Sequence, residues 1–130
     1  MFLFEYQAKT MMREQGIPVL EGIVATSEQR ALDAARELGE GPWVIKAQIH
    51  AGGRAEGRVG GSEDLRGIEF SNTVLGVGQT AARMLGKSLV TPQTTRQGET
   101  INAVYIEPEI RSELQIFLAI LIDGERGEPV

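Results

Sequence analysis

The chain contains no cysteine, a single histidine and few aromatic residues, which make up 5% of its 130 residues. Without cysteine it can form neither a disulfide framework nor a thiolate metal site. No stretch is apolar over the length of a membrane span, and the first residues, which include Glu5, lack the apolar run of a signal peptide. These absences predict a protein of a reducing compartment, which we expect to be the cytoplasm, with no membrane partner.

An excess of basic residues is also missing. The chain has 18 acidic residues against 13 basic ones, and its formal net charge is −5. Surfaces that follow a nucleic-acid backbone are normally basic, so we expect no nucleic-acid partner. With 42% apolar and 24% charged residues and no internal repeat, the composition predicts one ordinary globular core.

Apolar periodicity and stop signals predict three helices. The first spans residues 4–15, where apolar side chains recur at helical spacing and Gly16 follows. A second helix is expected between the capping-box form T-x-x-Q at residues 26–29 and Gly39. Its apolar stripe is made by Ala31, Leu32, Ala35 and Leu38. A short third helix is expected in residues 80–85.

Several strands are predicted between and after these helices. Residues 19–26 suit a short strand, and residues 43–50 alternate between an apolar face and a polar face that carries Lys46, Gln48 and His50. A hairpin turn is expected at residues 95–99, before a strand at residues 101–110. Residues 114–122 are almost continuously apolar, which is typical of a central strand covered on both faces. A turn follows at "DGERGEPV", and the whole pattern indicates the α+β class.

The stretch "KAQIHAGGRAEGRVGG", residues 46–61, ends a predicted strand in a glycine-rich turn. Glycine backbone is costly to order and persists where another backbone or a ligand must come close. Lys46 and Arg54, together with the free N–H groups of Gly52 and Gly53, would form a cradle for a polyphosphate. The alternative is an ordinary glycine-rich hairpin loop.

Two further motifs resemble nucleotide-binding fingerprints. Gly76-x-Gly78-x-x-Ala81 has the form of a dinucleotide site, but a glycine-rich loop entering a short helix is the simpler interpretation. Gly86-Lys87-Ser88 copies the end of a P-loop whose first glycine would fall on Ala81, so a helix end capped by Gly86 is favoured.

Other polar residues leave alternatives open. His50 would reach a phosphate or serve as a hydrogen-bonded structural residue, and no pattern places a nucleophile beside it. Glu107, Glu109 and Glu113 surround Pro108 either as a solvated edge or as acceptors for ribose hydroxyls and an adenine amino group. Their spacing does not call for a metal.

The segments "FEYQAKTMMREQGIPV", "GPWVIKAQIHAGGR", "LGKSLVTPQT" and "VYIEPE" resemble the amino-terminal part of the beta subunit of succinyl-CoA synthetase, an enzyme of the tricarboxylic acid cycle. The beta subunits of malate-CoA ligases are similar. The resemblance is close over residues 4–54, loosens over 55–84 and then resumes. It implies an ATP-grasp fold, in which two lobes close on a nucleotide. Residues 20–110 would form the small lobe, and residues 1–19 and 111–130 would be elements of an incomplete second lobe.

The same resemblance implies roles for individual residues. Lys46 would contact nucleotide phosphate, Gly53, Arg54 and Ala55 would form the loop over it, and Glu107 would lie at the adenosine end. A further acid of the family aligns without gaps with Gln115, although Glu113 has the matching "E-L" context. The nucleotide would be ATP or GTP. The implied reaction converts succinate, CoA and the nucleoside triphosphate reversibly to succinyl-CoA, the diphosphate and phosphate.

The sequence also departs from the family. The loop has Ala55 and Glu56 where small or basic residues are usual. A β-carbon at a positive φ, or a carboxylate turned inward, would hinder a phosphate. The family's Mg²⁺ ligands lie in the second lobe and its phosphohistidine on a separate alpha subunit, so we expect 130 residues alone to be inactive. The competing hypotheses are a degenerate, non-enzymatic module that associates with itself or another subunit, and a small Rossmann-type dinucleotide binder.

Overall fold

Residues 2–130 are described by the computed structural model, and a four-stranded antiparallel sheet lies at its centre. The strand order of this sheet is β1 (Ile23–Ala25), β7 (Val104–Pro108), β2 (Trp43–Ala47) and β4 (Ile68–Ser71). A smaller antiparallel sheet has the order β3 (Arg58–Val59), β5 (Ser88–Val90) and β6 (Glu99–Thr100). The α+β class predicted from the sequence is confirmed.

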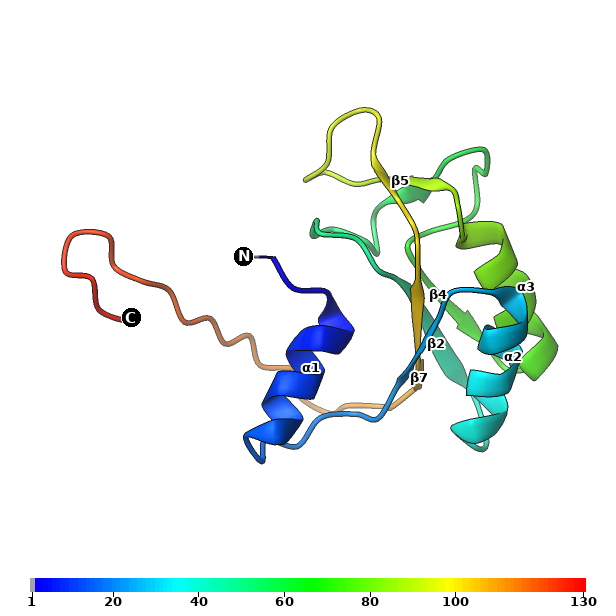
Figure 1. Ribbon diagram of the computed structural model, residues 1–130, viewed down its shortest axis with the longest axis horizontal. Coiled ribbons are helices and arrows are strands. Elements are labelled where there is room, and N and C mark those ends of the chain that lie inside the picture. Colours follow the sequence, from blue (N-terminus) through cyan, green and yellow to red (C-terminus); the bar gives the residue numbers. More distant parts are fainter. Residues whose placement is uncertain (1) are drawn as a thin grey trace.

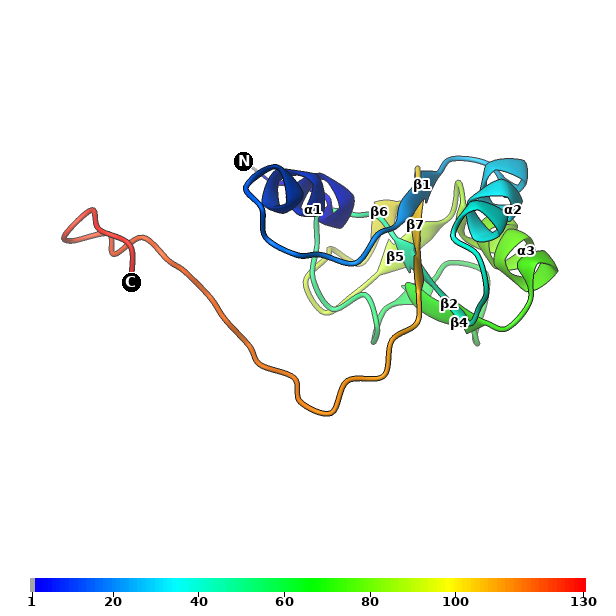
Figure 2. The same cartoon turned by 90° about the horizontal axis from the view of Figure 1, so that it is seen from below.

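Helices lie on both faces of the central sheet, but only one face carries a well-packed core. Helices α2 (Glu28–Glu37) and α3 (Val74–Met84) cover one side, and α1 (Glu5–Glu14) lies on the other (Figures 1 and 2). The core under α2 and α3 is built from fully buried apolar side chains that include Ala31, Ala34, Ile45, Val77, Met84 and Ile106. Helix α1 contains no buried residue, so apolar burial contributes little to its attachment.

The predicted first and second helices form, with one correction. Helix α1 matches the expected residues 4–15 within one residue at each end. Helix α2 is capped by Ser27, whose side chain accepts a hydrogen bond from the Arg30 N–H at 3.1 Å, so the predicted cap at Thr26 is wrong by one position. The helix ends before Gly39, which has a φ of +88°, as the stop signal predicted.

Helix α3 begins six residues earlier than the short helix predicted at 80–85. Gly76 and Gly78 therefore lie inside a helix, and the prediction of a glycine-rich loop before it is wrong. Because glycine has a low helix propensity, the sequence pattern does not indicate a helix over the first six residues of α3. A β-carbon on Gly78 would lie 2.6 Å from Leu32 Cδ2, so the glycine allows α3 to pack closely against α2.

The strands agree with the sequence pattern more closely at the centre of the sheet than at its edges. Strand β2 has the predicted start at residue 43 but ends at Ala47, and β1 is limited to three residues of the expected 19–26. The predicted hairpin at residues 95–99 is confirmed: it joins β5 to β6, and Gly98 N–H donates to the Thr95 carbonyl at 3.0 Å.

The predicted central strand at residues 114–122 does not form. This segment leaves the sheet after β7 and runs away from it (Figures 1 and 2), with Phe117 91% exposed. Its last residues meet the chain again around a turn, where Leu121 and Val130 exchange two backbone hydrogen bonds. A strand needs a hydrogen-bonded neighbour, and none of the described residues forms a β-bridge with residues 114–120. None of the described helices is both long and apolar enough to cross a membrane.

Candidate functional site

The register of the central sheet brings Lys46 and Glu107 to the same face. In the pairing of β2 with β7, Lys46 lies opposite Tyr105, and Glu107 lies opposite Val44. Tyr105 and Glu107 are two residues apart on β7, so their side chains point to the same face of the sheet. Lys46, opposite Tyr105, points to that face too and is the diagonal neighbour of Glu107. Lys46 Nζ donates to Glu107 Oε2 at 2.5 Å. Glu107 is 1% exposed, which makes this a nearly buried ion pair.

Helix α1 adds two further charged groups to this face. Glu5 Oε1 accepts a hydrogen bond from Lys46 Nζ at 2.8 Å and lies 3.3 Å from Lys9 Nζ. Lys9 also forms an ion pair with Glu107 Oε1. Arg54 completes the cluster, because its Nη2 donates to Glu5 Oε2 at 2.6 Å. We call these five residues the charge cluster; it holds three cations and two carboxylates.

The glycine-rich turn reaches the cluster through Arg54. Arg54 Nη1 donates to the Ala47 carbonyl at 2.9 Å, which fixes the guanidinium beside the end of β2. Gly53 has a φ of +73°, a conformation that glycine adopts without strain. On its other side the turn packs against residues 91–93, where Gly52 N–H donates to Gln93 Oε1 at 3.0 Å. The turn is thus an ordered element joined to Lys46 through Glu5.

Opposite charges determine the ionisation of the cluster. Burial by itself would raise the pKa of Glu5, but hydrogen bonds from Lys46 and Arg54 outweigh it and lower the pKa to about 2. Burial would lower the pKa of Lys46, but hydrogen bonds to Glu107 and Glu5 raise it above its ordinary value. All of this favours the ionised forms of both groups at neutral pH.

Aromatic rings border the cluster. Lys9 Nζ lies 5.4 Å from the centroid of the Tyr105 ring, and burial together with the Glu107 carboxylate raises the pKa of Tyr105 to about 12. The ring of Phe4, just before α1, stacks on His50 with centroids 3.9 Å apart. His50 therefore has an aromatic partner, while its backbone N–H donates to Glu99.

The two unusual loop residues carry no backbone strain. Among the described residues only glycines have a positive φ, so the β-carbon of Ala55 lies in an ordinary conformation. Ala55 and Glu56 are both exposed. The steric condition under which Ala55 would hinder a phosphate is not met.

The structure unites some of the predicted residues and separates another. Lys46, Arg54 and Glu107 share the charge cluster, and Gly53 and Ala55 flank Arg54. Both Glu107 oxygens are bound by ammonium groups. Gln115 follows β7 in the chain, and its side-chain amide donates to Ser112 at 3.3 Å. The ribbon beyond β7 runs away from the sheet (Figure 1). The roles of Glu107 and Gln115 at the adenosine end stay predictions.

Sequence reasoning missed Glu5 and Lys9. Both lie in the "EYQAK" segment, and their spacing of four residues is that of an ion pair on one helix face. A spacing of four residues is, however, typical of an ion pair on an exposed helix surface. Nothing in the sequence indicates that this helix contacts the strands that carry Lys46 and Glu107. Only the tertiary structure places α1 over β2 and β7.

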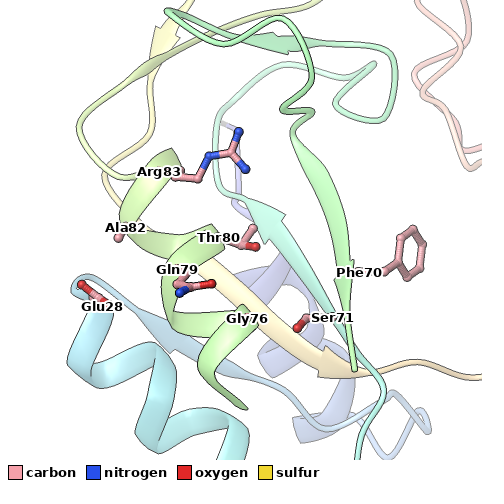
Figure 3. Close-up of a pocket in the computed structure, with 8 residues that line it drawn as sticks. All are labelled: Glu28, Phe70, Ser71, Gly76, Gln79, Thr80, Ala82 and Arg83. Atoms are coloured by element: carbon pink, nitrogen blue, oxygen red, sulfur yellow. The ribbon is translucent and has the colours of Figure 1, made fainter. Parts of the chain in front are cut away.

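The other two motifs find different explanations. The dinucleotide fingerprint requires parallel βαβ structure, whereas both sheets here are antiparallel and its glycines lie inside α3. A surface pocket of about 460 Å³ does lie between α3 and β4 (Figure 3), but no residue of the charge cluster lines it. Gly86 has a φ of +73° directly after α3, which fits the helix end predicted there.

The described residues do not fit a Mg²⁺ site. Across residues 2–130, no group of three or more His, Cys, Asp or Glu side chains is placed to hold a metal ion. In the charge cluster the carboxylate oxygens are already bound by cations. A phosphate, in contrast, matches the ammonium and guanidinium donors.

Comparison with known proteins assigns residues 2–130, all of the described chain, to one family. The model of the ATP-grasp domain matches residues 2–130. The beta subunit of the ADP-forming succinate–CoA ligase of Acidithiobacillus ferrooxidans is 42% identical over 128 residues, which is 98% of this chain and 30% of that subunit. The beta subunits so named from Cereibacter sphaeroides and Paracoccus denitrificans are 41% and 42% identical, over 95% of this chain and 32% of theirs. The chain thus spans about a third of the length of these curated relatives. It belongs to the ATP-grasp domain family.

Proposed function

We propose that this chain binds the polyphosphate of ATP or GTP at Lys46 and Arg54, beneath the turn formed by Gly53, Arg54 and Ala55. One observation supports the proposal most strongly. Lys46 and Arg54 bind the two oxygens of a single carboxylate, that of Glu5, at 2.8 and 2.6 Å. An ammonium group and a guanidinium group that together bind two oxygens of one carboxylate can bind two oxygens of one phosphate in the same way.

The remaining features agree with a phosphate site. The cluster has one more cation than carboxylates in a protein whose formal net charge is −5. Lys46 is held by Glu107 and Arg54 by the Ala47 carbonyl, so both donors are positioned before a ligand arrives. Preorganised donors lower the entropic cost of binding.

The proposal extends to the longer proteins that this chain resembles. We propose that the site is the nucleotide-binding part of a succinate–CoA ligase, which joins succinate to CoA while a nucleoside triphosphate is split. In that protein Glu107 and Gln115 would lie near the adenosine end, Mg²⁺ would be bound by residues outside the 130, and an alpha subunit would carry the phosphorylated histidine. Such an enzyme would work in the cytoplasm.

Isothermal calorimetry with ATP and GTP tests the site. We expect binding by the wild-type chain and loss of that binding in Lys46→Ala, because the variant removes the central phosphate donor. Lys87→Ala is the matched control: Lys87 belongs to the P-loop-like segment and is exposed. Equal affinity of wild type and Lys46→Ala would contradict the proposal, and loss of binding in Lys87→Ala would move the site to the other motif.

Association without nucleotide is a second candidate function. It is favoured by the apolar side chains of the segment beyond β7, among them Leu114, Ile116, Phe117 and Leu118, which are between 75% and 91% exposed. Surfaces of this kind are usually covered by protein. Analytical ultracentrifugation distinguishes the candidates, because a module of this type would form dimers or larger species and would give no heat with ATP.

A further inference from the structure

Within the charge cluster, Glu5 is the carboxylate that binds both Lys46 and Arg54, whereas Glu107 binds Lys46 and Lys9. Glu5 Oε1 accepts from Lys46 on β2, and its Oε2 accepts from Arg54 in the glycine-rich turn. One anionic group therefore bridges the two donors to which we assign phosphate binding. A phosphate placed between the same donors would meet the Glu5 carboxylate.

We infer that Glu5 is a tethered anion that takes the place of a phosphate between Lys46 and Arg54, and that polyphosphate binding requires the first turn of α1 to move away. The inference rests on the proposed function. It adds that the Glu5 carboxylate competes with the nucleotide phosphate for Lys46 and Arg54. The affinity for nucleotide therefore depends on the free energy of replacing the carboxylate by the phosphate.

The two cations keep other partners when Glu5 leaves. Lys46 remains bound to Glu107 on β7, and Arg54 remains bound to the Ala47 carbonyl. Both partners belong to the central sheet, which carries buried residues on β2 and β7. The donors would thus stay in position while the carboxylate is exchanged for a phosphate of higher charge.

Helix α1 is attached weakly enough for this movement. It contains no buried residue, and Phe4 at its N-cap offers no side-chain oxygen to the free N–H groups of the first turn. Among the described residues, the polar and aromatic contacts that hold it are the ion pairs of Glu5 and Lys9, Lys9 over the Tyr105 ring, Phe4 on His50 and Tyr6 near Tyr105. Segments with few buried apolar contacts open at low free-energy cost.

The test compares the affinity of the 130-residue chain and its variants for inorganic pyrophosphate, measured by isothermal calorimetry. We expect Glu5→Gln to bind pyrophosphate about tenfold more tightly than wild type, because the competing charge is gone. Glu14→Gln is the matched control, since it removes the same charge from the exposed end of the same helix. We expect its affinity to equal that of wild type.

The outcomes separate the inference from the proposed function. If Lys46→Ala loses pyrophosphate binding but Glu5→Gln binds no more tightly than Glu14→Gln, the inference is overturned and the phosphate site remains. If neither wild type nor Glu5→Gln binds, both fail.

Hydrogen exchange on the wild-type chain gives a second measurement that does not depend on how the variants fold. The Ala8 amide donates to the Phe4 carbonyl at 3.0 Å and so reports on the first turn of α1. We expect this amide to exchange faster when pyrophosphate is bound, although ligands usually slow exchange near their site. Slower or unchanged exchange would overturn the inference.

Discussion

Replacing Glu107 by glutamine removes the carboxylate at the centre of the charge cluster. Glu107 is 1% exposed and binds both Lys46 and Lys9, whose side chains are 20% and 18% exposed. Removing one partner of a buried ion pair typically costs about 3–5 kcal/mol. The lysines can partly turn to water, and glutamine still accepts one hydrogen bond, so we expect the free energy of unfolding to fall by about 2–3 kcal/mol.

Urea denaturation followed by the fluorescence of Trp43 measures this loss. Trp43 is the only tryptophan and lies at the start of β2 with 4% of its surface exposed, so its emission reports on the sheet that carries the cluster. Glu109→Gln is the control: Glu109 is exposed, and among the described residues its side chain forms no ion pair, so we expect a change within about 0.5 kcal/mol. If Glu107→Gln were as stable as this control, the cluster could not have the buried geometry described above.

Two further predictions concern α1 and α2. The folded pKa of Glu5, about 2, lies below its ordinary value of 4.5, so the stability that Glu5 contributes is complete above pH 4.5 and is lost as the pH falls towards 2. The pKa difference corresponds to on the order of 3 kcal/mol, and acid denaturation curves of wild type and Glu5→Gln should converge near pH 2; a constant gap between them would contradict this assignment. At the start of α2, Ser27→Ala should lower the free energy of unfolding by about 1 kcal/mol, because Ser27 caps the helix. Thr26→Ala should lower it by much less. Thermal denaturation that gave the reverse order would favour the cap at Thr26 predicted from the sequence.

Sequence reasoning succeeded where local rules decide the structure. The helix at residues 4–15, the stop at Gly39, the hairpin at 95–99 and the strand that carries Lys46 depend on periodicity and on glycine conformations, which neighbouring residues determine. It failed where packing overrides propensity: Gly76 and Gly78 are helical because α3 packs against α2. It also failed for residues 114–122, whose apolar pattern describes a buried strand that the described residues do not cover.

The sequence by itself determined the family, the α+β class and the two cations Lys46 and Arg54, because motif spacing and residue chemistry are properties of the chain alone. Only the tertiary structure decided that Glu5 and Lys9 join them. Glu5 lies 41 positions from its partner Lys46, and Lys9 lies 98 positions from its partner Glu107. Contacts over such separations exist only after the sheet has formed and α1 has docked on it. The physical reason is that local propensity acts over one or two turns, whereas a buried carboxylate attracts whichever cations the fold brings within reach.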